Sequence, residues 1–380
     1  MPCRVTIAQA CPARNRQADD ICVAFAKRGA IVRTHTSWDC SDERKQRCGI
    51  AERLLSWLPH GRGLGRACDF ARRVGLPASD VLVCVNYAAL LAGAPLALLR
   101  RPKVIYYCLE MVKDKMDIAI ETSVCRRLSA IVLVPEENRA RLLEARLEGR
   151  CSIHIVPNVP HLRTDVVRQG KLRDYVGMRF HQNDPTIVLY SGSYQSYSRL
   201  EDIVKYSAAW PSGTCLVLML TGSYPDELCS AVRASQNRAI IVPSVGTAEL
   251  YSWIADADIG LLPYEDERDS NVRYCAPQKV FDYVACGIPF IGSRRPSIEA
   301  VAEEVGCGLC IDMTDSTALL GAVRTLECNG TLRRLMAARA RKAYADKYHY
   351  DRYIGPILAS LFTPELCAKA RFRQRCRPTL

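Results

Sequence analysis

Two charged residues near position 280 have the types and the spacing that ligand chemistry needs. The segment Ala276–Gly292 reads APQKVFDYVACGIPFIG and places Lys279 three residues before Asp282. Residues three apart are neighbours on one face of a helix. A lysine supplies a cation for phosphate oxygens, and a carboxylate accepts hydrogen bonds from ribose hydroxyls. This pair therefore fits the chemistry of a nucleoside diphosphate ligand.

The residues around this pair predict a short helix followed at once by a strand. Val280, Phe281 and Val284 form an apolar face that is suited to packing on a sheet. Gly287 is a typical helix end, and the apolar run Ile288–Ile291 then predicts a strand. The helix is thus expected to be held by a sheet, with its charged face exposed to a ligand.

Short apolar runs alternate with helical patterns along the whole chain, which predicts an α/β fold with parallel sheets. A first series of strands is expected at Arg4–Gln9, Ala30–Thr36, Asp80–Asn86, Lys103–Cys108, Ala130–Val134 and Ser152–Val156. A second series is expected at Thr186–Ser191, Thr214–Thr221, Ala239–Val242, Ile259–Leu262, Ile288–Ile291 and Gly308–Ile311. The proline-bounded stretch between the series predicts a linker with a helix near Lys171–Val176. Further helices are expected at Asp19–Arg28, Glu136–Leu147, Leu332–Tyr348 and Tyr353–Phe362.

The composition limits the class of protein. A chain of 380 residues is long enough for two domains, and 49% hydrophobic with 24% charged residues is ordinary for a globular protein. The 19 cysteines are irregularly spaced, and many lie inside apolar runs, which disfavours a disulfide scaffold. No secretory leader and no membrane-spanning run is visible. We therefore expect a cytoplasmic protein.

The positive charge is uneven, because most of the net charge of +12 falls in residues 1–170. The arginines there are scattered and belong to no nucleic-acid motif, so no nucleic-acid partner is expected. A basic first half fits an anionic acceptor, or peripheral contact with the lipid head groups of the inner membrane face. An ordinary solvated basic surface is the alternative.

The segment Ala276–Gly292 resembles the donor-binding signature of GT-B glycosyltransferases of the retaining family-four type, and the resemblance extends over nearly the whole chain. It implies two Rossmann-like domains that face each other across a cleft. These are an acceptor-binding domain at 1–165, a linker at 166–184 and a nucleotide-sugar-binding domain at 185–350. A terminal helix that crosses back and a basic tail follow at 351–380. The implied reaction moves a sugar from a nucleoside diphosphate sugar to a hydroxyl or amine, with retention and with no further cofactor.

The resemblance also implies which residues form the donor side. Gly192 would let the backbone approach the donor phosphates, which Lys279 and Arg199 would hold. The arginine that usually follows this glycine is Ser193 here, and the first of the family's two glutamates is Tyr274. The expected donor-binding residues are Gly192, Ser193, Arg199, Ser244, Tyr274, Cys275, Lys279 and Asp282.

Glu110 is the expected catalytic carboxylate on the acceptor side. It would orient an acceptor hydroxyl or balance positive charge on the sugar, although a salt bridge to Lys113 or Lys115 is the alternative. The expected acceptor-side residues are Arg14, Asn15 and Asn158. For Asn158 a simple Asx turn is the alternative.

No metal site is expected. Asp256 and Asp258 have the spacing of a metal-binding D-x-D motif, but they end a helix and precede a strand. The acidic loop Glu265–Asp269 either replaces the missing glutamate or is a solvated turn. A nucleotide-sugar 2-epimerase of the same fold and a non-catalytic GT-B partner subunit remain open as other functions. The acceptor, whether lipid-linked glycan, polysaccharide or small natural product, and the donor sugar are not determined by the sequence.

Overall fold

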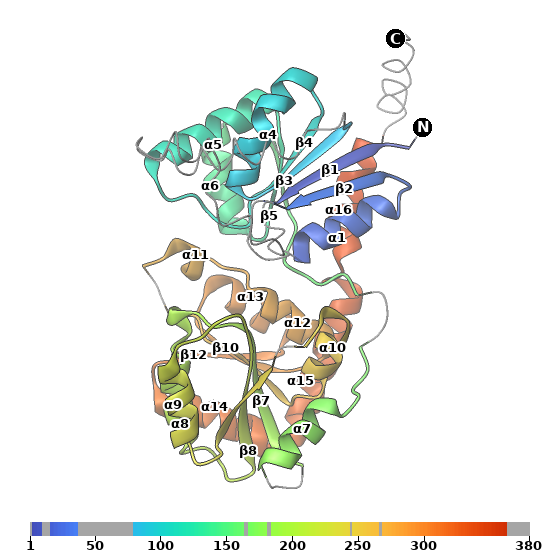
Figure 1. The fold of residues 1–380 in the computed structure, drawn as a ribbon. Helices are drawn as coiled ribbons and strands as arrows, with labels where there is room; N and C mark the ends of the chain where they lie inside the picture. The colour runs from blue at the N-terminus through green and yellow to red at the C-terminus, as the bar shows by residue number, and fades with distance from the viewer. Residues whose placement is uncertain are drawn as a thin grey trace, which may run out of the picture. The chain divides into compact units, whose positions relative to one another are not determined.

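The computed structural model describes residues 2–9, 16–36, 79–162, 166–180, 184–243, 245–265 and 268–362. The chain forms two compact units, the first made of Met1–Pro157 with Tyr350–Leu380 and the second of Asn158–His349. In each unit, helices cover a parallel sheet (Figure 1).

The first unit contains a sheet that has, within the described residues, six parallel strands in the order β2-β1-β3-β4-β5-β6. Its strands are β1 Arg4–Gln9, β2 Ile31–Thr36, β3 Val81–Val85, β4 Lys103–Tyr107, β5 Ile131–Val134 and β6 Ser152–Ile155. Its helices are α1 Arg16–Ala26, α4 Tyr87–Arg100, α5 Lys115–Leu128, α6 Glu137–Leu147 and α16 Tyr350–Leu361. Every residue of β3 is buried, as expected for a parallel strand whose two faces are both covered.

The helix α16 comes from the far end of the chain and packs on α1. The Lys27 ammonium lies 3.0 Å from the Asp351 carboxylate, and the Phe25 and Phe362 rings are 6.0 Å apart. Ile354 and Leu358 are fully buried on the inner face of α16. The first unit is therefore completed by residues that follow the second one in sequence.

The second unit has, in the part of the chain that is described, a parallel sheet with the order β12-β11-β10-β7-β8-β9. Its strands are β7 Thr186–Ser193, β8 Thr214–Thr221, β9 Ala239–Pro243, β10 Ile259–Leu262, β11 Phe290–Ser293 and β12 Gly308–Ile311. Its helices are α7 Lys171–Phe180, α8 Leu200–Ser207, α9 Asp226–Ala234, α10 Thr247–Ala255, α11 Ser270–Arg273, α12 Gln278–Cys286, α13 Pro296–Val305, α14 Ser316–Cys328 and α15 Gly330–Asp346.

The strand order of this second sheet reverses direction once. The chain builds β8 and β9 on one side of β7, and then crosses to add β10, β11 and β12 on the other side. In open α/β sheets, ligands bind beyond the carboxyl ends of the strands at such a switch point. The ends of β7 and β10 are therefore the place in this unit where a ligand is expected.

Each strand predicted from the sequence is present, and one of them is displaced. The strand expected at Ile288–Ile291 begins at Phe290. Gly287 closes α12 in the left-handed conformation, with φ of 66°, and the Ile288 amide still donates to the Tyr283 carbonyl. Pro289 has no amide hydrogen to donate, so its hydrogen bonding with β10 is limited to its carbonyl, which accepts from the Gly260 amide at 2.8 Å, and the paired residues begin at Phe290.

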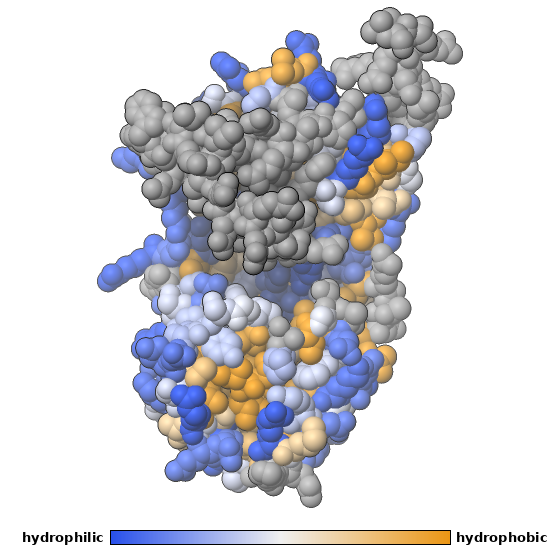
Figure 2. Space-filling model, in the orientation of Figure 1, coloured by the Kyte–Doolittle hydropathy of each residue, from blue (hydrophilic) through white to orange (hydrophobic). Residues whose placement is uncertain are grey.

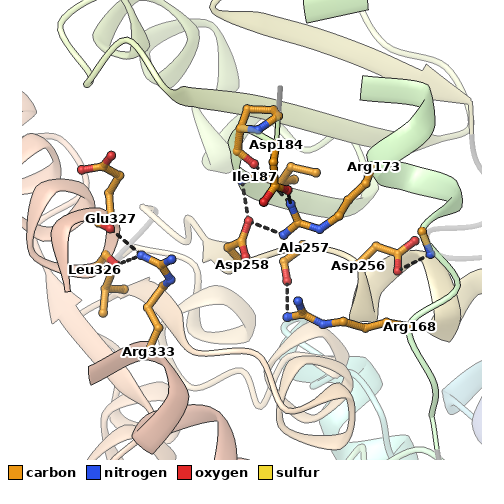
Figure 3. A network of polar contacts seen from close by, with 12 residues as sticks. Arg168, Arg173, Asp184, Ile187, Asp256, Ala257, Asp258, Leu326, Glu327 and Arg333 are labelled. Carbon is orange, nitrogen blue, oxygen red and sulfur yellow. Dashed lines mark hydrogen bonds and ion pairs between the residues drawn. The ribbon is translucent and has the colours of Figure 1, made fainter. Parts of the chain in front are cut away.

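The two aspartates of the D-x-D sequence have structural roles, which Figure 3 shows. The Asp256 side chain is fully buried and accepts hydrogen bonds from three backbone amides at the start of α7, those of Gln169, Gly170 and Leu172. Asp258 accepts from the Ile187 amide at 2.9 Å and pairs with Arg173 at 2.7 Å. Both carboxylates therefore anchor α7 to the rest of the second unit. This helix lies in the segment that was expected to be a linker.

Figure 2 shows apolar residues gathered on the middle of the second unit, with hydrophilic residues around them. Among the described helices, none has the length and apolar character required to cross a bilayer.

Candidate functional site

Gly192 lies at the carboxyl end of β7, at the switch point of the second sheet. Its φ is 139°, a backbone conformation that side chains rarely allow. A Cβ atom at this position would lie 2.7 Å from Cε and 2.9 Å from Nζ of Lys279. A glycine here therefore lets the lysine side chain lie directly against the end of the strand. Two predicted donor residues that are far apart in sequence are thus brought into contact.

Lys279 lies in the first turn of α12 and has aromatic neighbours. Its ammonium is 4.9 Å from the ring centre of Tyr190, 5.6 Å from that of Tyr264, and 3.4 Å from the Tyr264 hydroxyl. Aromatic faces attract a cation without neutralising it. Within the described residues, no carboxylate forms an ion pair with Lys279. Among these residues, no carboxylate therefore competes with an anionic ligand for the half-buried lysine.

Tyr264 is held in place by the residues that follow β11. The Tyr264 amide donates to the Ser293 hydroxyl at 2.7 Å, and Arg295 Nε donates to the Tyr264 carbonyl at 2.6 Å. The Tyr264 ring stacks on Tyr197, with centroids 5.4 Å apart. Burial raises the pKa of the Tyr264 hydroxyl well above its usual value, so this side chain stays neutral.

Glu265 is not part of a solvated turn, and that alternative of the sequence interpretation is wrong at this residue. Its side chain is only 11% exposed and pairs with the buried Arg295 at 3.4 Å. The Ser293 hydroxyl also donates to it. Burial raises the pKa of the Glu265 carboxyl, and these two partners oppose the rise. Glu265 and Arg295 therefore form a largely buried ion pair, and Arg295 also bonds to the backbone of Tyr264.

Asp282 lies one turn after Lys279 on α12, as the spacing predicts. The residue is 8% exposed, and the Tyr251 hydroxyl of α10 donates to its carboxylate at 3.4 Å. The side chain is thus nearly buried and oriented by a neutral partner. Its expected contact with a ribose stays a prediction.

The end of β7 and the start of α8 carry two more residues expected on the donor side. The Tyr190 hydroxyl donates to the Ser193 carbonyl at 2.7 Å, which fixes the end of the strand. Arg199 begins α8 in the left-handed conformation, and its exposed guanidinium pairs with Asp202 at 2.6 Å. A solvated pair of this kind is weak. Donor binding by Ser193 and phosphate binding by Arg199 remain predictions.

Asn158 bonds to the loop that precedes α12. Its side-chain amide nitrogen donates to the Ala276 carbonyl at 2.7 Å, which ties Asn158 to this loop. Tyr274 ends the short helix α11, and the Arg273 guanidinium lies 5.3 Å from its ring centre. Cys275, which is half-buried, follows in the same loop.

Glu110 lies in a bend after β4 and is exposed. In the described part of the chain, neither Lys113 nor Lys115 forms an ion pair with it, so the salt-bridge alternative is not found. Arg139 donates to the carbonyls of Cys108 and Leu109 and thereby fixes the start of the bend. Glu110 and the donor residues belong to different units, so their proximity stays a prediction.

Three expected site residues, Arg14, Asn15 and Ser244, lie outside the described residues. Two residues at the site, Tyr190 and Tyr264, were not expected. In the sequence each follows an apolar run, where a tyrosine is also an ordinary core residue. The only available signal was their position at the ends of strands that flank the switch point.

Comparison with known proteins supplies the family context of this site. Residues 207–359 match the family described as glycosyl transferase-like. Sucrose-phosphate synthase from Thermosynechococcus elongatus superposes with a TM-score of 0.72 at 16% identity, covering 95% of this chain and 99% of that one. The chain has the GT-B glycosyltransferase fold. The expected glycosyltransferase resemblance and the two-domain α/β architecture are thereby confirmed.

Two further relatives of this GT-B chain bear names that concern sugars. N-acetyl-alpha-D-glucosaminyl L-malate synthase from Bacillus anthracis is 24% identical over 174 residues, which cover 44% of this chain and 43% of that protein. The match therefore spans less than half of that relative's length. Anabaena HepE in complex with UDP and glucose superposes with a TM-score of 0.67 at 11% identity, covering 94% of this chain and 99% of that one.

Proposed function

We propose that this chain is an active glycosyltransferase that moves a sugar from a nucleoside diphosphate sugar to an acceptor hydroxyl or amine. The observation that carries the proposal is the Lys279 ammonium, which lies against Gly192 at the switch point of the second sheet. Its aromatic surroundings leave the charge available for the donor diphosphate. We further propose that the reaction retains the anomeric configuration and needs no metal ion.

Catalysis would come from stabilising the diphosphate as it leaves. Negative charge develops on the leaving oxygen, and a fixed cation beside that oxygen lowers the barrier. The start of α12 supports the same charge, because helix N-termini attract anions and Pro277 provides no side-chain cap there. Lys279 sits in this first turn, so the lysine and the helix act on the same phosphate.

The nucleoside side of the donor is assigned to α12 as well. Asp282 is one turn from Lys279, which matches the separation between a diphosphate and the ribose that carries it. The Tyr251 hydroxyl orients the Asp282 carboxylate for the ribose hydroxyls. UDP sugars are the first donors to test, because the structural neighbour HepE is described in complex with UDP-glucose.

The acceptor side is assigned to the first unit. Glu110 is exposed in the bend after β4 and is proposed to orient the acceptor hydroxyl. The net charge of +12 favours an acceptor that carries negative charge or is presented at an anionic membrane surface. A lipid-linked glycan, a polysaccharide and a small natural product are the acceptor classes to try.

Turnover of nucleotide sugars tests this proposal. The full chain is incubated with UDP, GDP and dTDP sugars in the presence of EDTA, and release of the nucleoside diphosphate is measured with and without acceptors. We expect release from at least one donor, with the α configuration of an α-linked sugar retained in the product. Free epimer formed without any acceptor would instead indicate the epimerase. A chain that neither binds nor turns over any donor would contradict the transferase proposal.

A further inference from the structure

A second polar site lies in the first unit, between α5 and α6. It is a groove of about 460 Å³ lined by Ala119, Thr122, Ser123, Arg126, Arg127, Ala145, Arg146 and Glu148. Three of these residues are arginines and one is a glutamate. The groove therefore has an excess of positive charge, and nothing in the proposed reaction uses it.

One of the three guanidinium groups, that of Arg126, has polar partners among the described residues. Arg126 pairs with Glu148 at 2.8 Å and also donates to the Arg146 carbonyl. These contacts tie the end of α5 to the end of α6. The Glu148 side chain is 65% exposed, so water screens much of its charge.

Two guanidinium nitrogens at the groove have unused hydrogen-bonding capacity. Nε of Arg126 and Nη1 of Arg146 are buried, and among the described residues neither has a hydrogen-bond acceptor. Buried donors in folded proteins are nearly always paired, and leaving one unpaired costs about 1–3 kcal/mol. Both nitrogens are covered by surrounding atoms in this conformation, so an anion in the groove would reach them only after the two side chains turn toward it.

A buried carboxyl group, that of Glu121, lies near Arg146. Glu121 lies on the buried face of α5 and accepts from the Tyr106 hydroxyl at 2.5 Å. Within the described part of the chain it forms no ion pair with Arg146. Burial raises the pKa of the Glu121 carboxyl, and the nearby arginine charges oppose this rise. The small side chains Ala119, Ser123 and Ala145 leave room for a compact ligand.

We propose that this groove binds a phosphate group. Guanidinium groups bind phosphate oxygens through two parallel hydrogen bonds, a geometry that a lysine does not offer. The phosphate belongs either to a free phosphate compound or to a phospholipid head group. Met116 and Ile120, which are exposed on the same helix α5, provide apolar contact in the second case.

Calorimetric titration with inorganic phosphate, at constant ionic strength, tests the site in the full chain. All variants carry Lys279→Ala, so that phosphate bound at the proposed donor site does not contribute. We expect Arg126→Gln and Arg146→Gln each to weaken phosphate binding about tenfold, the loss of one charged hydrogen bond. Among the described residues, the Arg127 side chain makes no hydrogen bond or ion pair, and we expect Arg127→Gln to weaken phosphate binding less. Arg141→Gln, an exposed arginine of α6 that pairs with Glu137, is the matched control and should change nothing.

Sedimentation with lipid vesicles distinguishes the two sources of phosphate. The same variants are mixed with phosphatidylglycerol or phosphatidylcholine vesicles. If the protein binds inorganic phosphate and the groove variants lose this binding, the ligand is a free phosphate compound. Binding to phosphatidylglycerol vesicles alone, lost in the same variants, supports the head-group form. The proposal is overturned if the chain binds neither inorganic phosphate nor phosphatidylglycerol vesicles. It is also overturned if Arg126→Gln, Arg146→Gln and Arg127→Gln all leave the observed binding unchanged. Neither result depends on whether the chain transfers a sugar.

Discussion

At the scale of single residues, the site depends on a glycine as much as on a lysine. Gly192 has a φ of 139°, and its missing Cβ is the space that the Lys279 side chain occupies. At this position, a side chain on residue 192 would collide with the lysine, so the close approach depends on glycine. The position of the ammonium is thus set by backbone geometry and by two tyrosine rings.

Gly192→Ala tests this relation. The added methyl group would strain the backbone and push the Lys279 ammonium away, because Cε lies 2.7 Å from the position that the methyl carbon would take. We expect a loss of about 1–3 kcal/mol in the free energy of unfolding and about tenfold weaker nucleoside diphosphate binding. Urea unfolding and calorimetry measure the two effects.

Gly321→Ala is the matched control for that substitution. Gly321 lies inside α14 with nothing within 4 Å of the added methyl, so alanine should stabilise the helix by up to about 1 kcal/mol and leave binding unchanged. Unaltered nucleotide affinity in Gly192→Ala would show that the ammonium is not held by this contact.

The sequence predicted part of this site. Lys279, Asp282 and Gly192 belong to motifs in which residue type and spacing report chemistry directly. Tyr190 and Tyr264 do not, because their role depends on the strand order, which brings the ends of β7 and β10 together. Glu265 was misjudged because its buried partner, Arg295, lies beyond two helices and a strand, α11, α12 and β11.

At the scale of elements, buried carboxylates hold helices in place. The Asp256 carboxylate accepts hydrogen bonds from three backbone amides at the start of α7. Amides at a helix N-terminus have no acceptor within the helix, and here a side chain from outside α7 supplies it. The sequence shows only an aspartate pair before a strand. It could not reveal this role, because the amides lie more than eighty residues earlier in the chain.

Asp256→Ala should therefore destabilise the second unit. Three buried amides would lose their acceptor, and we expect a loss of about 2 kcal/mol or more in the free energy of unfolding, measured in urea. Asp315→Ala removes an exposed cap of α14 and should cost about 1 kcal/mol. Equal effects of the two substitutions would contradict the anchoring role of Asp256.

Glu121 on α5 gives the first unit a pH dependence. Burial raises the pKa of its carboxyl above the usual 4.5, so the folded state favours the protonated form. The resulting stabilisation is complete below pH 4.5 and is lost as pH rises through the raised pKa. We therefore expect the free energy of unfolding of the wild type, relative to that of Glu121→Gln, to decrease as the pH rises through the raised pKa. Urea unfolding at several pH values measures it.

Glu137→Gln is the control for this titration, because Glu137 is exposed on the neighbouring helix α6. Its stability difference from the wild type should not follow the same curve. If the Glu121→Gln difference is constant from about pH 4 to about pH 8, the carboxyl does not titrate as proposed.

At the scale of the whole molecule, the alternation of apolar runs and helical patterns predicted the architecture. Parallel strands are buried on both faces and appear in the sequence as continuous apolar runs, which is why most strand positions agree with the structure. The exception, β11, starts late because Pro289 cannot donate to the ladder. The packing of α16 on α1 is a long-range contact, and only the resemblance to a family suggested it.

The central claim is that Lys279 binds the diphosphate of a nucleotide-sugar donor. Calorimetric titration of the wild-type protein, Lys279→Ala and Lys205→Ala with UDP, GDP and dTDP tests it most directly. Lys205 is an exposed lysine of α8, with 69% of its side chain accessible, and serves as the control. We predict that one nucleotide binds the wild type and Lys205→Ala equally, and binds Lys279→Ala about ten- to a hundredfold more weakly. Equal affinity of the wild type and Lys279→Ala for that nucleotide would contradict the claim.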